Sequence, residues 1–189
     1  MTDKLSVGDP ITADCELIQV HVTDLKQLFN PIDPSPPREK DLAAQSEDFI
    51  VAWARAAKRE VRLALQVDVD TPASKEDAST VGDAVREFFH QRSLSASRRL
   101  SQLFRVGRTS LLIGIAALAV AVTVASLVER LPGDRAFGAL LRETLVIGGW
   151  VAMWRPLEIF LYDWWPIRAE RKLYERLSRM PVNVTIYGQ

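Results

Sequence analysis

Few side chains in the sequence have the type and spacing that catalysis would need. The two histidines, His21 and His90, lie in no metal-ligand spacing, and Cys15 has no base near it in sequence. Asp68 and Asp70 fall on one face of an expected strand, where they form either a cation site or a solvated sheet face. Glycine-rich phosphate loops, nucleophile elbows and paired-cysteine motifs are absent from the sequence. We therefore expect a protein that is not an enzyme, with no catalytic, cofactor-binding or metal-binding residues.

The most suggestive charges lie in an aromatic stretch, residues 154–168, with the sequence WRPLEIFLYDWWPIR. Arg155 and Glu158 are three residues apart, so in a helix they share a face and can pair. Charges within a membrane span often mark an interaction or conduction path, whereas indoles and arginines at its edge fix depth and contact headgroups. Both interpretations stay open. The candidate membrane-interface residues are Arg155, Glu158, Trp164, Trp165 and Arg168.

A second candidate is the proline-rich segment 31–37, PIDPSPP, in which four of seven residues are proline. Such a segment has no regular structure and is stiff, since each proline fixes φ. It is either a preformed surface for a partner or a connector that aims the next helix. The candidate interaction residues are Pro31, Asp33, Pro34, Pro36 and Pro37.

The elements that would position these residues include two apolar stretches. Residues 109–128 form an uncharged run of twenty, which as a helix spans roughly 30 Å, the thickness of a hydrocarbon core. A second span is expected near residues 144–163, bent at Pro156. The alternative, a buried core helix, would need more covering protein than so small a chain offers. Small residues at four-residue spacing suit close packing within or between chains: Ala117, Ala121 and Ala125, and Gly148 and Ala152.

Charge and composition indicate where the chain resides. Arginine and lysine are concentrated before the first stretch and after the second, and no signal peptide is visible, so both termini are expected in the cytoplasm. The single cysteine fits a reducing compartment. Twenty-four basic and 24 acidic side chains give a net charge of zero, which argues against nucleic acid as a partner. The expected location is a bacterial inner membrane, with the lipid bilayer as one partner.

Alternating apolar residues predict strands over 16–22, 61–70 and 182–187, and helices are expected over 46–58, from 81 toward the first span, and over 167–180. In the helix over 46–58, Phe49, Ile50, Trp53, Ala54 and Ala57 form the apolar stripe. The expected fold is an α+β membrane protein: a transmembrane hairpin inserted in a small cytoplasmic α/β domain, whose three-stranded sheet the C-terminal strand completes. The expected divisions are 1–106, 107–165 and 166–189.

Three segments of the sequence resemble a family of uncharacterised bacterial inner-membrane proteins with two transmembrane helices. They are LFNPIDPSP at 28–36, VREFF at 85–89 and the tryptophan-rich stretch at 154–168. The resemblance implies an inner-membrane location and brings no activity with it.

Two functions remain open on the sequence. The first is a non-catalytic, membrane-anchored cytoplasmic module that binds a protein partner or assembles with its own copies. The second is a subunit of a small oligomeric channel or transport component, in which several chains together would line a pore.

Overall fold

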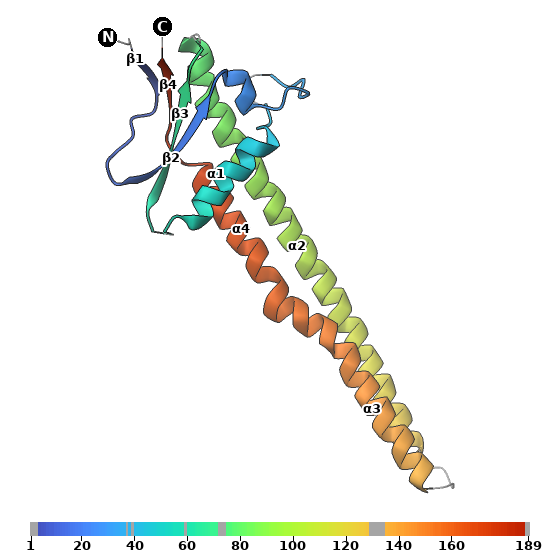
Figure 1. The fold of residues 1–189 in the computed structure, drawn as a ribbon. Coiled ribbons are helices and arrows are strands. Elements are labelled where there is room, and N and C mark those ends of the chain that lie inside the picture. The colour runs from blue at the N-terminus through green and yellow to red at the C-terminus, as the bar shows by residue number, and fades with distance from the viewer. Residues whose placement is uncertain are drawn as a thin grey trace. The chain divides into compact units, whose positions relative to one another are not determined.

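The structure, a computed structural model, describes residues 4–36, 38, 40–58, 60–71, 75–128 and 135–187 (Figure 1). It is an α+β protein with a four-stranded mixed sheet and two long apolar helices. The chain divides into two compact units. Unit 1 comprises Met1–Ser95 and Glu170–Gln189, and unit 2 comprises Ala96–Ala169. Helices α2 (Lys75–Val128) and α4 (Trp164–Leu177) each contribute residues to both units.

The sheet of unit 1 has the strand order β1-β4-β3-β2. Its strands are β1 (Lys4–Gly8), β2 (Cys15–Val22), β3 (Arg62–Val69) and β4 (Val182–Tyr187). Strand β3 is parallel to both β2 and β4, and β1 is antiparallel to β4. The expectation of three strands is wrong, because β1 adds a fourth. Its sequence KLSVG carries only two apolar residues, too short a pattern for alternation to reveal.

A tight corner after β1 fixes this strand on β4. Gly8 has a φ of 123°, and a Cβ at this position would lie 2.4 Å from the Val182 carbonyl oxygen. The next residue, Asp9, donates its backbone N–H to the same carbonyl at 2.9 Å. The Asp9 carboxylate also accepts a hydrogen bond from Arg86 Nη1 of α2 at 2.5 Å. The corner thus joins β1, β4 and α2 through one aspartate.

The core of unit 1 lies on one face of the sheet, as the alternation of the strands predicts. Helix α1 (Ala44–Ala56), the first turns of α2 and the last turns of α4 bury their apolar side chains against β2, β3 and β4. Within α1, Ile50, Val51 and Ala54 are buried, whereas Phe49 and Trp53, expected in the core, are 44% and 46% exposed. The buried residues and the two exposed aromatic residues both have helical spacing, so spacing alone does not choose between them. In the structure the smaller side chains pack against the sheet.

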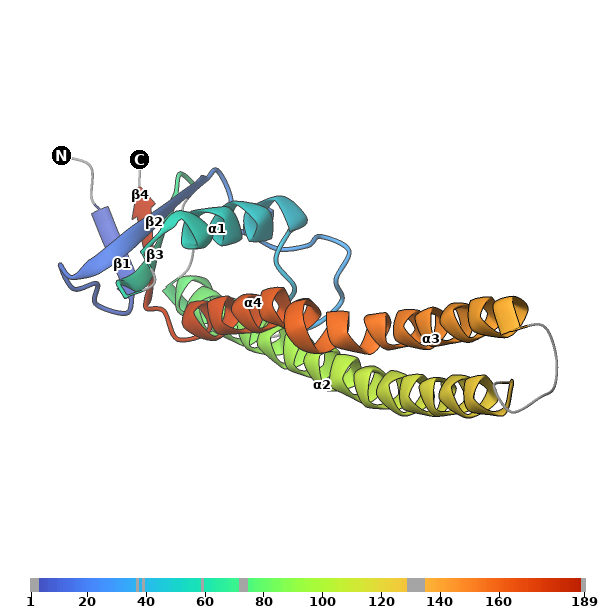
Figure 2. The same cartoon turned by 90° about the horizontal axis from the view of Figure 1, so that it is seen from below.

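Unit 2 contains the second part of α2, then α3 (Arg135–Glu158) and a short π-helix, η2 (Ile159–Asp163). Helices α2 and α3 lie side by side and antiparallel (Figure 2). Two helical segments are long and apolar enough to cross a membrane: Glu76–Val128 in α2, and Gly138–Leu177, which runs through α3, η2 and α4. Only 11% and 17% of their most apolar windows are buried. Large side chains such as Leu112, Val151 and Trp154 are about two-thirds exposed. A core helix of a soluble protein would bury these groups.

The two helices approach closely at small residues. A Cβ at Gly107 would lie 2.9 Å from Ile159 Cγ2, one at Gly114 3.1 Å from the Ala152 carbonyl oxygen, and one at Gly149 2.8 Å from Leu118 Cδ1. From residue 107 on, all but one of the less exposed positions of α2 are spaced alternately by three and four residues, as in helices that pack side by side: 107, 111, 114, 118, 121, 125 and 128, with 110 outside this spacing.

The stripe of small residues expected from the sequence is therefore partly wrong. Ala121 and Ala125 lie on the contact face, but Ala117 is exposed. On α3 the contact glycine is Gly149, whereas a Cβ at Gly148 would meet nothing within 4 Å. A spacing of four residues drifts about 40° per step around a helix, so it leaves the contact face sooner than a three-and-four alternation does.

The neighbouring glycines of α3 provide a matched test of this packing. We expect Gly149→Leu to lower the stability of the helix pair by roughly 1–3 kcal/mol, because the added side chain must displace Leu118. Gly148→Leu should change stability little. Thermal unfolding of the detergent-solubilised protein measures both, and equal effects of the two substitutions would contradict the observed contact face.

Candidate functional site

The proline-rich segment lies in a loop between η1 (Leu25–Leu28) and α1, and the neck of this loop is closed by backbone pairing. The Ala43 N–H donates to the Leu28 carbonyl at 2.9 Å, and Phe29 and Leu42 form an isolated antiparallel bridge. The Asn30 N–H then donates to the Asp41 carbonyl at 2.8 Å. The described residues of this segment, 30–36, 38, 40 and 41, therefore belong to a loop that leaves and re-enters the fold at one point, and we call them the docking loop.

Asp33 fixes the docking loop from within. One carboxylate oxygen accepts the Ser35 N–H at 2.9 Å, and the other accepts the Asp41 N–H at 2.7 Å across the loop. The backbone hydrogen bond from Asp41 and the hydrogen bonds from Ser35 hold the pKa of the Asp33 carboxyl below its ordinary value, since they favour the charged form. Asp33, predicted as an interaction residue, thus has both carboxylate oxygens engaged within its own loop.

The outer surface of the docking loop carries an apolar side chain among the prolines. Pro31, Pro34 and Pro36 are exposed, and Ile32 is 86% exposed, more than any other large apolar residue described. Pro37, the last predicted interaction residue, lies outside the described residues. Sequence reasoning passed over Ile32, although an isoleucine within a proline-rich turn has no strand or helix in which to become buried.

In unit 2, the structure brings Arg155 and Glu158 together as their spacing predicts. Arg155 Nη1 lies 2.9 Å from Glu158 Oε2 and also 3.7 Å from Asp163 Oδ2, a residue that sequence reasoning did not select. In a regular α-helix a residue eight positions further on would point about 80° away from Arg155. The π-helix η2 takes more residues per turn and so rotates Asp163 back toward the arginine.

The tryptophans follow directly after the π-helix. The backbone N–H of Trp164 is directed at the Tyr162 carbonyl, and its indole Nε1–H donates to the Phe160 carbonyl oxygen at 2.9 Å. The guanidinium of Arg168 lies 5.5 Å from the Trp164 ring centroid, within the range of a cation–π contact. Trp165 contacts Trp164 at 5.3 Å between centroids and is 65% exposed. The five predicted interface residues thus form two groups, an ion pair and an aromatic–arginine cluster.

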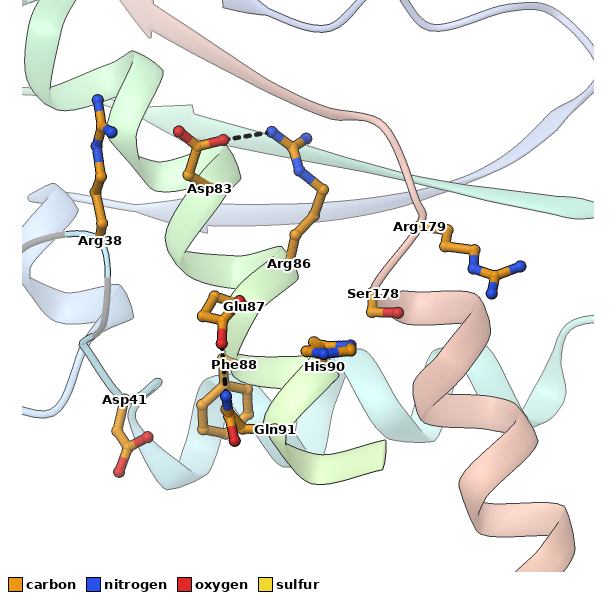
Figure 3. A pocket seen from close by; sticks show the side chains of 10 residues that line it. All are labelled: Arg38, Asp41, Asp83, Arg86, Glu87, Phe88, His90, Gln91, Ser178 and Arg179. Carbon is orange, nitrogen blue, oxygen red and sulfur yellow. Dashed lines mark hydrogen bonds and ion pairs between the residues drawn. The ribbon is translucent and has the colours of Figure 1, made fainter. Parts of the chain in front are cut away.

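Unit 1 also has a surface hollow of about 1000 Å³, lined by residues of the docking loop, α2 and the turn after α4 (Figure 3). Two pairs of its lining residues are in contact: Arg86 Nη2 lies 2.8 Å from Asp83 Oδ1, and Gln91 donates a hydrogen bond to Glu87. The Ser178 hydroxyl donates to the Glu175 carbonyl at 3.0 Å, so it forms no nucleophile–base pair with His90. The Arg38 and Asp41 side chains point in opposite directions.

The remaining chemical candidates of unit 1 are paired at the surface. His21 Nε2 lies 3.1 Å from Asp70 Oδ2, and both side chains are at least half exposed. Asp68 accepts a hydrogen bond from Gln66 at 3.0 Å on the same strand. Across the described part of the chain, no three histidine, cysteine or acidic side chains are grouped as metal ligands.

Comparisons of the chain with models of protein families, with curated protein sequences and with solved structures find no match. The resemblance to two-span inner-membrane proteins therefore stays a prediction.

The hydrogen bonds of Asp33 predict a pH-sensitive docking loop. Because the pKa of Asp33 is lowered, its contacts are fully present above the ordinary carboxyl pKa and are lost as the pH falls through the lowered value. At neutral pH, Asp33→Asn should speed amide hydrogen exchange of the segment containing Ser35 and Asp41 by roughly threefold or more, since an amide has only one acceptor oxygen. Asp14→Asn, an exposed aspartate elsewhere in unit 1, is the control. Unchanged exchange in Asp33→Asn would show that the loop is fixed without Asp33.

The indole hydrogen bond at the π-helix gives a second prediction. Trp164→Phe leaves the Phe160 carbonyl without this donor, and we expect the protein to lose about 1–3 kcal/mol of stability in detergent. Trp165→Phe is the matched control, because its exposed ring has no such bond among the contacts of the described residues. If both substitutions have the same small effect, the indole bond does not stabilise the turn.

Proposed function

We propose that this protein is a non-catalytic, membrane-anchored interaction module. Unit 2 crosses a bacterial inner membrane as a helical hairpin inserted in the α/β domain, both termini lie in the cytoplasm, and unit 1 binds a protein partner or another copy of the chain. The outward-facing apolar side chains of unit 2 support the membrane part of the proposal, because water would solvate such a surface poorly.

The fixed docking loop carries the binding part of the proposal. An exposed isoleucine on a flexible segment would lose conformational entropy on binding, which reduces affinity. In the docking loop much of that entropy is already lost, since Asp33 accepts hydrogen bonds from Ser35 and, across the loop, from Asp41, and the prolines fix the backbone. Ile32 is therefore held ready to enter an apolar pocket of a partner.

The half-exposed aromatic residues of α1 extend the surface available to a partner. Phe49 and Trp53 are four residues apart, so they share one face of the helix, and they flank the buried stripe. Tryptophan is enriched at the centres of protein interfaces, because it buries a large area at low entropic cost.

Site-specific cross-linking in native membranes tests the binding role. With a photoreactive residue in place of Pro36, we expect a discrete adduct whose yield Ile32→Ser lowers at least about tenfold, the effect of about 1.4 kcal/mol. The amount of protein in the membrane should not change, since Ile32 is 86% exposed. Leu94→Ser, at an exposed apolar residue of unit 1 outside the loop, is the control. An adduct that does not depend on Ile32, or no adduct at all, would overturn the docking role.

The mass of the purified protein in detergent separates this proposal from an oligomeric channel. Helices α2 and α3 pack closely at Gly107, Gly114 and Gly149, where an added Cβ would meet atoms of the other helix, so a lumen would have to form between copies. A monomer or dimer fits the interaction module. A discrete particle of four or more chains would favour the channel.

A further inference from the structure

Unit 2 carries a set of arginines that no acidic side chain neutralises. From residue 96 to residue 128 the sequence has no aspartate or glutamate. Among the described residues these arginines have no ion pair, in contrast to Arg155, and all are exposed. The members of this set, here called the arginine collar, are Arg98, Arg99, Arg105, Arg108 and Arg168.

The collar lies at one end of the apolar helix pair. The first four arginines precede the apolar stretch of α2, and Arg168 follows η2. Because the helices are antiparallel, with Gly107 against Ile159 and Phe104 6.2 Å from Phe160 between ring centroids, these positions belong to the same end of unit 2. The opposite end contains the last residues of α2 and the first residues of α3.

Two arginines of the collar, Arg98 and Arg105, face away from the partner helix. Arg98 and Arg105 are seven residues apart and so point within about 20° of each other. Gly114, which contacts α3, is nine residues after Arg105 and thus about 180° around the helix. The guanidinium groups of Arg98 and Arg105 therefore project outward.

Apolar side chains interleave with the collar. Val106, between Arg105 and Gly107, is 48% exposed, and the exposed apolar surface begins fully at Leu112. On the other chain segment, Arg168 lies over the Trp164 ring, and the exposed Trp165 is adjacent. Arginine, indole and aliphatic side chains at one level match the boundary between headgroups and acyl chains. A nucleic acid would not cover the valine and tryptophan surface, so a lipid fits the collar better.

We propose that the arginine collar binds the phosphate groups of anionic phospholipids in preference to zwitterionic ones. The inference rests on the proposed membrane span of unit 2 and names the lipid class that this span selects. A guanidinium offers two parallel N–H donors to a phosphate diester, and the charge on a lipid such as phosphatidylglycerol is not cancelled by its own headgroup. Among the residues that the structure describes, these arginines have no acidic partner that would have to be displaced first.

Quenching by brominated lipids measures the preference on the full-length protein. Four of the five tryptophans, Trp150, Trp154, Trp164 and Trp165, lie in unit 2 and report on contact with brominated acyl chains. The protein is reconstituted in phosphatidylcholine containing a fixed fraction of brominated phosphatidylglycerol or of brominated phosphatidylcholine. We expect the relative association constant to favour phosphatidylglycerol about fivefold or more, the factor supplied by about one arginine near a charged surface.

The variant Arg98→Gln/Arg105→Gln/Arg108→Gln should bring this ratio close to one. A matched control, Arg55→Gln/Arg62→Gln/Arg179→Gln, removes the same charge from exposed positions of unit 1 and should keep the wild-type ratio. A wild-type ratio near one with strong quenching by both lipids would overturn the collar and leave the membrane span standing. No quenching by either lipid would overturn the span itself. If the control variant lowers the lipid ratio as much as the collar variant does, the preference is an effect of net charge. That result would also overturn the collar.

Discussion

The fold of unit 1 depends on the position of its last strand. Strand β4 lies inside the sheet, between β1 from the N-terminus and β3 from the middle of the chain. The helices of unit 2 come between β3 and β4 in the sequence, so both ends of that apolar segment must return to one domain. The Gly8–Asp9 corner secures the arrangement, because Asp9 bonds to β4 and to Arg86 of α2. Backbone pairing along β4 thus connects the chain's beginning, middle and end.

In unit 2 many large apolar residues point outward. Glycine, alanine and proline lie in the contact between α2 and α3, together with larger residues such as Leu118 and Ile159. Close backbone approach is the main source of helix association where the surroundings are as apolar as the side chains. The π-helix adds a polar element at the end of this contact. There the Trp164 indole donates to the Phe160 carbonyl oxygen, and Arg155 pairs with the carboxylates of Glu158 and Asp163.

Patterns of polarity predicted the elements that have one clearly buried face. Strands β2, β3 and β4 and the pairing of Arg155 with Glu158 followed from residue spacing. Strand β1 was not predicted, because its two apolar residues form no clear alternation. What makes it a strand is its pairing with β4, more than 170 positions away in the sequence. The π-helix was not predicted either, since a shift of hydrogen-bond register leaves no polar or apolar pattern in the sequence. The contact of Asp163 with Arg155, which depends on the π-helix, was therefore missed as well. Gly149 rather than Gly148 packs against α2, and this depends on the side chains of α2, which the sequence of α3 alone does not reveal. Ile32 was overlooked because an isoleucine in a sequence is usually taken for a core residue, and only the structure shows that this one is exposed.

The antiparallel pairing of β1 with β4 brings the two chain ends together, with Lys4 opposite Tyr187 (Figure 1). Joined ends and a new opening between α2 and α3 would therefore give a circular permutant that retains every strand pairing of the sheet. In such a permutant the sheet domain is one continuous stretch of sequence, flanked by an apolar helix at each end. The order of elements along the chain is thus separable from their arrangement in the sheet.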